Sequence, residues 1–260
     1  MAKVGIVEHI EACNGAGRLA LVVYLLHGYP SAEVSEAAFE LLKRHRAILE
    51  CGLPVSSLPS SSASSAIVEA HNQASQLERS DEALLSFYAR YRPNFLAHMK
   101  DEGRRDTNEL LRQIQGRCDA VMTDYAPLAA AISERAARGE RAPLLIQTVS
   151  ALSEAPERDF SVHQDGLLIH LGVSSRIGGD LLPLKQIQTA VDKIAQAAPH
   201  AKILCGFGVR SAADVAYIRR LRGVHGVTVA TEPLRRLARG LSAFASWLEE
   251  IDRELTREYT

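Results

Sequence analysis

The stretch KILCGFGVRSAAD, residues 202–214, reads as one complete strand–turn–helix unit. Its first part, Lys202–Cys205, is typical of a short buried strand. Gly206 and Gly208 then favour a tight turn, because glycine adopts backbone angles that other residues avoid. The capping-box pattern that starts at Ser211 predicts that a helix begins directly after it. A unit of this kind connects one strand of a parallel sheet to the next strand through a helix.

The same alternation of apolar runs and helical patterns continues outward in both directions, with a leading helix in residues 1–17 and a serine-rich loop at residues 55–66. Eight strands with helical crossovers are the pattern of a (β/α)₈ TIM barrel in a single α/β domain, with a doubly wound open sheet as the alternative. The expected strands are Leu19–Leu26, Ala47–Glu50, Leu84–Arg90, Ala120–Asp124, Leu144–Val149, Leu167–Leu171, Lys202–Cys205 and Gly226–Ala230. The expected helices are Val4–Cys13, one capped by Ser31, Thr107–Ile114, Leu128–Arg138, Leu184–Ala197, one capped by Ser211, and one that begins at Glu232.

The composition narrows the functional class. Hydrophobic residues make up 47% of the 260 residues, charged residues 23%, and the net charge is −1, which excludes a disordered chain and a nucleic-acid binder driven by bulk positive charge. We find no apolar run of membrane-spanning length and no export signal, and the four cysteines form no CxxC pair, so we expect a cytoplasmic protein with reduced thiols. We expect no cofactor and no metal. The histidines outside the strands are expected at the surface, namely His9, His45, His71, His98 and His200.

In such a barrel, ligands bind where the strands end. Glu50 closes the second expected strand, and a carboxyl group there either finds an ion-pair partner or acquires the raised pKa of a general acid–base group. Asp124 closes the fourth strand, where it either contacts a ligand or caps the next helix. Tyr88 and Arg90 are expected at the end of the third strand.

Glycine turns near the last strands predict a phosphate site built from backbone N–H groups. Its expected members are Gly178, Gly179, Gly206, Phe207, Gly208, Ala230 and Thr231. Glu232 would repel an anion there unless its side chain points away. A loop over the barrel mouth could act as a lid, and the candidates for it are Ser60, Ser61 and Arg176.

Several of these stretches resemble the tryptophan synthase α-subunit family, which has a glycine–proline turn after strand one and a Glu-x-Gly-x-Pro-x-Ser motif after strand two. The matching stretches here are Val22–Pro30, Glu50–Ser56, Asp119–Asp124, Gly206–Val209 and Val229–Thr231. The strand-two motif is fairly specific, and the others support it.

The resemblance implies a TIM-barrel lyase of tryptophan biosynthesis. That family cleaves indole-3-glycerol phosphate by a retro-aldol reaction, and the indole passes to a PLP-dependent β-type partner subunit. Carried over, Glu50 would transfer a proton at indole C3, Asp124 would match a strand-four aspartate, and Gly206, Gly208 and Thr231 would lie at the phosphate site.

The chain departs from that family pattern at three positions. Ser61 replaces the second catalytic aspartate, Tyr29 replaces an aspartate of the first turn, and a family tyrosine on strand six maps to about Ile169. Three functions therefore stay open. The chain could be a divergent lyase that uses Glu50 on a related phosphorylated substrate or an ordinary α subunit that uses a different acid (Asp124 or Glu69). It could also be a degenerate, non-catalytic barrel that binds and regulates a PLP-dependent partner or senses a phosphorylated metabolite.

Overall fold

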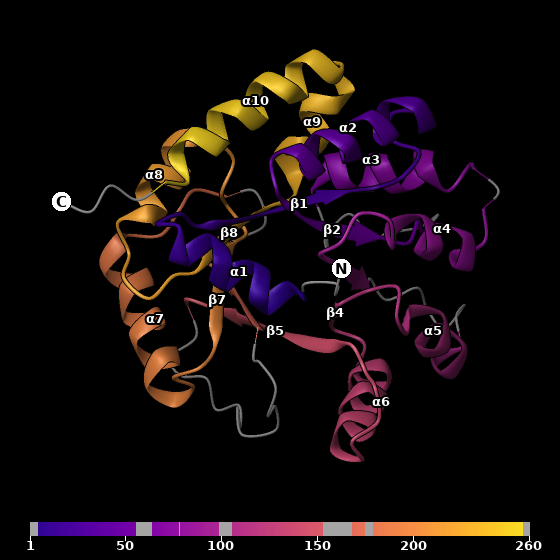
Figure 1. Cartoon of the computed structure of the whole chain (residues 1–260). Coiled ribbons are helices and arrows are strands. Elements are labelled where there is room, and N and C mark those ends of the chain that lie inside the picture. Colours follow the sequence, from indigo (N-terminus) through magenta and orange to yellow (C-terminus); the bar gives the residue numbers. More distant parts are fainter. Residues whose placement is uncertain are drawn as a thin grey trace.

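A computed structural model describes residues 5–55, 64–77, 79–98, 106–152, 168–174 and 179–256. Eight parallel strands form a closed barrel in which each strand pairs with the next and β8 returns to β1. This confirms the expected (β/α)₈ fold, and Figure 1 shows the helices arranged around the strands. The strands are β1 (Ala20–Leu25), β2 (Ile48–Gly52), β3 (Asn94–His98), β4 (Ala120–Thr123), β5 (Leu144–Ser150), β6 (Leu168–Gly172), β7 (Lys202–Gly206) and β8 (Gly226–Val229).

The helices cover the outside of the barrel and one end of it. The leading helix α1 packs Ile6, Ile10 and Cys13 against the interior residues nearest the amino ends of the strands, so it closes that end. The opposite end, where the strands finish, is left for the loops. The helices are α1 (Ile6–Gly15), α2 (Ala32–Arg44), α3 (Ser65–Ala74), α4 (Asp81–Tyr88), α5 (Thr107–Ile114), α6 (Ala126–Ala137), α7 (Leu184–Ala197), α8 (Ala212–Arg219), α9 (Thr231–Ala238) and α10 (Leu241–Glu254).

The third strand differs from the sequence expectation. Residues 84–90, expected as a strand, lie in helix α4 and its end, and the strand β3 begins only at Asn94. The Ser80 hydroxyl accepts a hydrogen bond from the Ala83 N–H, which starts the helix. The aromatic residues Phe87 and Tyr88 gave this segment a strand-like composition, but they pack against Phe39 between the helices. Tyr88 and Arg90 therefore do not end a barrel strand.

The serine-rich segment is shorter than expected at its far end. Helix α3 begins at Ser65, inside the expected loop, while residues 56–63 lie outside the described residues. The sequence pattern also gave no expectation for α10, whose residues Phe244, Trp247, Leu248 and Ile251 are buried. The Trp247 indole N–H donates to the Arg210 carbonyl, which ties α10 to the loop before α8.

The capping box predicted at the start of α8 is present. The Ser211 hydroxyl accepts from the Asp214 N–H, and the Asp214 carboxylate accepts from the Ser211 N–H. Loss of such a cap destabilises a protein by about 0.5–2 kcal/mol. We expect Ser211→Ala to lower the free energy of unfolding by that amount in urea denaturation. Ser246→Ala, at an exposed position within α10, is the control and should cost nothing. Equal effects of the two substitutions would contradict this account of the cap.

The strand register sorts the interior side chains into layers of four, each supplied by alternate strands. The lower layers are apolar, and one consists of Val22, Phe95, Ile146 and Leu204. The next layer toward the carboxyl ends comes from the even strands and consists of Glu50, Met122, His170 and Thr228. We call it the even-strand layer. Above it lie Tyr24, Ala97, Thr148 and Gly206. The interior thus changes from apolar to polar at the level of Glu50.

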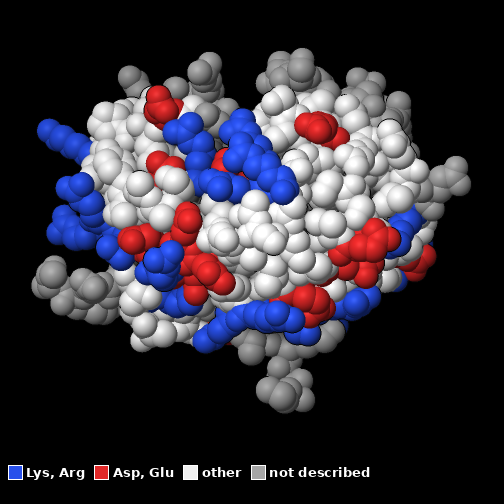
Figure 2. All heavy atoms as spheres, turned by 90° about the horizontal axis from the view of Figure 1, so that it is seen from above, with Lys and Arg blue, Asp and Glu red and all other residues white. Residues whose placement is uncertain are grey.

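The surface carries charges of both signs. Figure 2, a view from above α9 and α10, shows groups of Lys and Arg next to Asp and Glu. Ion pairs account for part of this arrangement, among them Arg18–Asp252 at 2.8 Å and Arg236–Glu232 at 2.7 Å. Within the described residues, no helix is long and apolar enough to cross a membrane.

Candidate active site

The even-strand layer places two ionisable side chains opposite each other inside the barrel. Glu50 comes from β2 and His170 from β6, which are diametrically opposed strands in a ring of eight. Thr228 and Met122 lie between them on β8 and β4. Glu50, His170 and Thr228 are buried, and each has one polar atom without a hydrogen-bond partner in the described part of the chain. Because nearly all buried polar atoms in proteins are hydrogen-bonded, three such atoms in one layer indicate a site for water or a ligand.

Glu50 lies inside the ring of strands, as a site residue at this end of the barrel must. It is 4% exposed, and its Oε2 atom is one of the three atoms without a partner. Burial disfavours the charged carboxylate and raises the pKa of Glu50 to about 8. The side chain is therefore protonated at neutral pH and can donate a proton, which is what the acid–base expectation requires.

His170 is the residue of this layer that the sequence did not reveal. The family tyrosine of strand six was mapped to Ile169, but Ile169 packs toward the helices and the next residue, His170, faces the interior. Its ring meets the Phe207 ring edge-on, with 4.5 Å between the centroids. Burial lowers the pKa of His170 to about 4, so the imidazole is neutral at pH 7. The sequence signal that could have indicated His170 is a histidine inside an otherwise apolar strand.

Gly206 is the reason why His170 fits. A methyl group at position 206 would lie 2.1 Å from the Nε2 atom of His170. We therefore expect Gly206→Ala to destabilise the fold by about 1–3 kcal/mol, the usual cost of overpacking. His170→Ala combined with Gly206→Ala should recover most of that loss, because the smaller side chain vacates the space. A thermal-unfolding double-mutant cycle measures this coupling, and strictly additive effects would rule it out.

Tyr24 lies above Glu50 and is oriented by a histidine from α3. The Val55 N–H donates to Nδ1 of His71 at 3.1 Å, so the proton of the neutral ring is on Nε2. Nε2 then donates to the Tyr24 hydroxyl at 2.8 Å. The Tyr24 hydroxyl therefore accepts this bond and does not use its own proton in it. Burial raises the pKa of Tyr24, and the nearby Glu50 carboxyl raises it further. His71 is fully buried and so is not the surface residue expected; His9 is likewise buried.

The structure brings several members of the expected phosphate site together. Gly208 has a positive φ of 130°, and a methyl group there would lie 2.8 Å from Cβ of Ser174 and 3.3 Å from the Gly179 carbonyl. The loops after β6 and β7 thus meet at glycines. Gly206 is the last residue of β7, and Ala230 follows the last residue of the neighbouring strand β8. Gly178 lies outside the described residues.

The two helix starts near these glycines differ. At α8, the Asp214 carboxylate already accepts hydrogen bonds from the N–H groups of Arg210 and Ser211. These two donors at the start of α8 are therefore taken by a side chain of the same helix. At α9, the N-cap residue Ala230 provides no side-chain cap. Glu232 bonds Arg236 along α9, so its carboxylate is compensated within the helix. Of the two ends, α9 is the one that leaves its first N–H groups without a side-chain cap.

Of the remaining candidates, the structure describes Asp124 but not the residues expected in a lid. Asp124 is exposed just after β4, and the N-cap of α6 is its neighbour Tyr125, not Asp124. Ser60, Ser61 and Arg176, expected in a lid, are outside the described residues. Within the described residues, no group of three His, Cys, Asp or Glu side chains could hold a metal ion.

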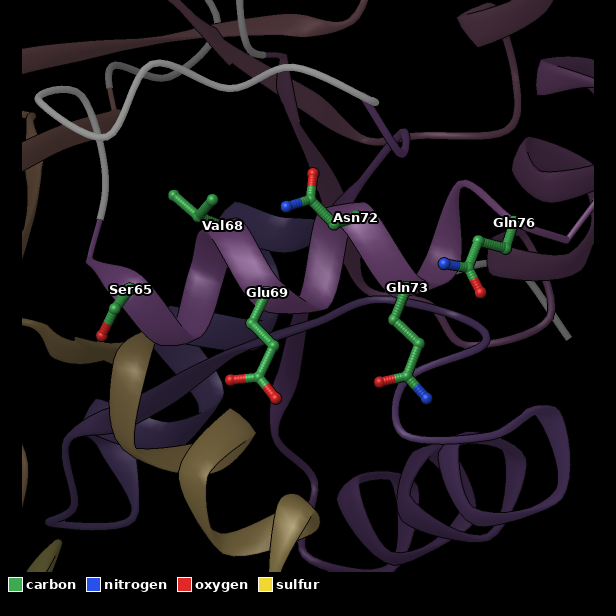
Figure 3. A pocket seen from close by; sticks show the side chains of 6 residues that line it. All are labelled: Ser65, Val68, Glu69, Asn72, Gln73 and Gln76. Carbon is green, nitrogen blue, oxygen red and sulfur yellow. The ribbon is translucent and has the colours of Figure 1, made fainter.

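Glu69, the other acid considered from the sequence, lies on α3, outside the ring of strands. It lines a pocket of about 610 Å³ together with Ser65, Val68, Asn72, Gln73 and Gln76. Figure 3 shows Glu69 and Gln73 extending from one side of α3 and Val68 and Asn72 from the other. Glu50, by contrast, points into the barrel.

The fold and this layer together define a TIM barrel with a polar, ionisable layer at the carboxyl ends of its strands. Solved structures of tryptophan synthase are similar to it over nearly the full length. A chain of the M. tuberculosis enzyme in its open form is 20% identical, with 98% of this chain and 100% of that chain covered and a TM-score of 0.78. The Legionella pneumophila tryptophan synthase alpha chain is 16% identical, with 95% of each chain covered and a TM-score of 0.75.

A chain from Aquifex aeolicus VF5 is similar as well, at 17% identity and a TM-score of 0.79, with 97% of this chain and 99% of that chain covered. No family model and no curated protein matches the sequence. At these identities the likeness shows the barrel fold, and the activity has to be inferred from the site.

Proposed function

We propose that this protein is a carbon–carbon lyase of the tryptophan synthase α type, which cleaves indole-3-glycerol phosphate or a related phosphorylated substrate by a retro-aldol reaction. The observation that carries the proposal is Glu50, a buried and protonated carboxyl group inside the barrel at the level where the interior turns polar. A protonated acid in this place can deliver a proton to the substrate carbon as the carbon–carbon bond breaks.

The phosphate group would bind at the glycine loops. Gly179 and Gly208 approach each other closely, and Ala230 and Thr231 begin the helix α9, whose N-terminus favours an anion. With the phosphate held there, the rest of the substrate would reach down toward the even-strand layer. Asp124 is exposed just after β4, so it would contact only the part of the substrate that is nearest to solvent.

The alternative is a barrel without this activity that binds or regulates a PLP-dependent β-type partner. Two observations favour it: a neutral Ser61 stands where the resembled family has its second acid, and Asp214 fills the N-terminus of α8. With either function, we propose that the protein is cytoplasmic and binds a phosphorylated small molecule.

The deciding experiment is an assay of the purified chain with indole-3-glycerol phosphate, alone and with a β-type subunit. The lyase proposal expects indole release, and glycerol 3-phosphate should compete by binding the glycine loops. Gly208→Ala should weaken that competition, because its side chain would displace the loop at Ser174 and Gly179. Binding of the β-type subunit without any indole release would favour the alternative instead.

A further inference from the structure

The proposed retro-aldol reaction needs two proton transfers. One proton goes to the ring carbon of the substrate, and another leaves the carbinol hydroxyl as that oxygen becomes a carbonyl. Glu50 is protonated at neutral pH and so supplies the first proton. A second group that accepts the other proton would let both transfers proceed together without returning that proton to Glu50, and Ser61 in the resembled loop is a hydroxyl with too high a pKa to act as that base.

The even-strand layer contains such an acceptor. His170 is directly across the barrel from Glu50, and its Nδ1 atom has no hydrogen-bond partner in the described part of the chain. Its ring is not free to swing, because Gly206 and the Phe207 ring lie against it. On the side of the carboxyl ends of the strands, the interior residue Thr148, which pairs with His170 in register, is exposed.

We propose that His170 is the second acid–base residue of this site and accepts the proton of the substrate's carbinol hydroxyl, while Glu50 donates a proton to the ring carbon from the opposite wall. This inference rests on the proposed function. The electron pair of the O–H bond forms the carbonyl, and the pair of the broken carbon–carbon bond restores the aromatic ring. The products are an arene and an aldehyde phosphate. The imidazolium of His170 and the carboxylate of Glu50 then exchange a proton to return to their starting states.

The environments of the two groups agree with these roles. Burial moves their pKa values in opposite directions, to about 8 for Glu50 and about 4 for His170, so one keeps its proton at pH 7 and the other has none. Two ionisable groups whose pKa values are pushed apart are the usual form of an acid and base pair. Tyr24 is the other ionisable side chain in these two interior layers, and burial keeps its hydroxyl protonated.

The test compares His170→Gln with Ile169→Val, its neighbour that faces the helices. With indole-3-glycerol phosphate, His170→Gln should lower kcat by about 10²–10⁴, the usual contribution of one acid–base group. Binding of glycerol 3-phosphate should stay within twofold of the wild type. In the wild type, kcat/KM should rise through about pH 4 and fall through about pH 8. The rise should disappear in His170→Gln, and added imidazole should restore part of the turnover of His170→Ala.

The outcomes separate the two proposals. If the wild type releases no indole with or without a β-type subunit, cleavage of indole-3-glycerol phosphate is wrong as its function, and the role of His170 in that cleavage is wrong too. If Glu50→Gln stops turnover but His170→Gln keeps kcat within threefold and keeps the rise of kcat/KM near pH 4, only the assignment of His170 is wrong. Failure of imidazole to restore any turnover in a folded His170→Ala protein would also overturn it.

Discussion

Glu50→Gln should lower the rate of indole-3-glycerol phosphate cleavage by about 10²–10⁴ without unfolding the protein. The amide has the shape of the protonated carboxyl group but cannot give up a proton to carbon. Because Glu50 is buried and neutral at pH 7, the substitution leaves the packing of the even-strand layer as it is. Steady-state kinetics with purified protein measures the effect.

The matched control is Leu49→Met, one residue earlier on β2, where the side chain packs toward the helices. A volume-conserving apolar exchange of this kind costs little stability and should leave kcat unchanged. If Glu50→Gln retained wild-type turnover, Glu50 would not be the acid, and the proposed chemistry would have to be abandoned.

The same substitution should make the protein more stable at neutral and alkaline pH. The folded-state pKa of Glu50 is raised from 4.5 to about 8, so between these values the unfolded chain releases a proton that the folded chain keeps. Stability is then lost as pH rises, by about 1.4 kcal/mol per pH unit. At pH 7 the loss is on the order of 3 kcal/mol, and Glu50→Gln removes it.

His170 acts with the opposite sign. Its folded-state pKa is lowered from 6.5 to about 4, so between these values the unfolded chain binds a proton that the folded chain does not, and stability rises with pH. For these two groups together, stability should be nearly level from pH 4.5 to 6.5 and should fall from 6.5 to 8. In Glu50→Gln it should rise to pH 6.5 and then stay level.

Urea denaturation at pH 5, 6.5 and 8 measures these profiles. Glu249→Gln, at an exposed position on α10, is the control and should follow the wild type at every pH. Parallel curves for wild type and Glu50→Gln would show that Glu50 is ionised in the folded protein, contrary to the acid role.

Much of the barrel follows from the sequence, because seven of its strands are short apolar runs, and the helix starts after β1 and β7 carry recognisable serine caps. The capping serines Ser31 and Ser211 both accept the bonds that the pattern predicts. The third strand was misplaced because composition cannot separate a short aromatic helix from a strand. In α4, the contacts that Phe87 makes with Phe39 and His27 decide the matter, and these come from distant parts of the chain.

The make-up of the even-strand layer was predicted only in part. Glu50 was expected at this end of the barrel because a carboxylate at the end of an apolar run is conspicuous, and its catalytic role stays a prediction. His170 was missed because its direction depends on the register of β6 against β5 and β7, and a shift of one residue exchanges the inner and outer faces of a strand. The role of Gly206 was likewise hidden, since the space that it leaves is filled by a side chain from the neighbouring strand.

The central claim is that the interior of this barrel holds a protonated acid facing its mouth. Carbon-13 NMR of the Glu50 side-chain carboxyl across a pH titration of the folded wild type tests it most directly, with Glu50→Gln used to assign the signal. The account predicts a protonated carboxyl at pH 7 that titrates near pH 8. A Glu50 signal that is already that of a carboxylate at pH 7 and titrates below pH 5 would contradict it.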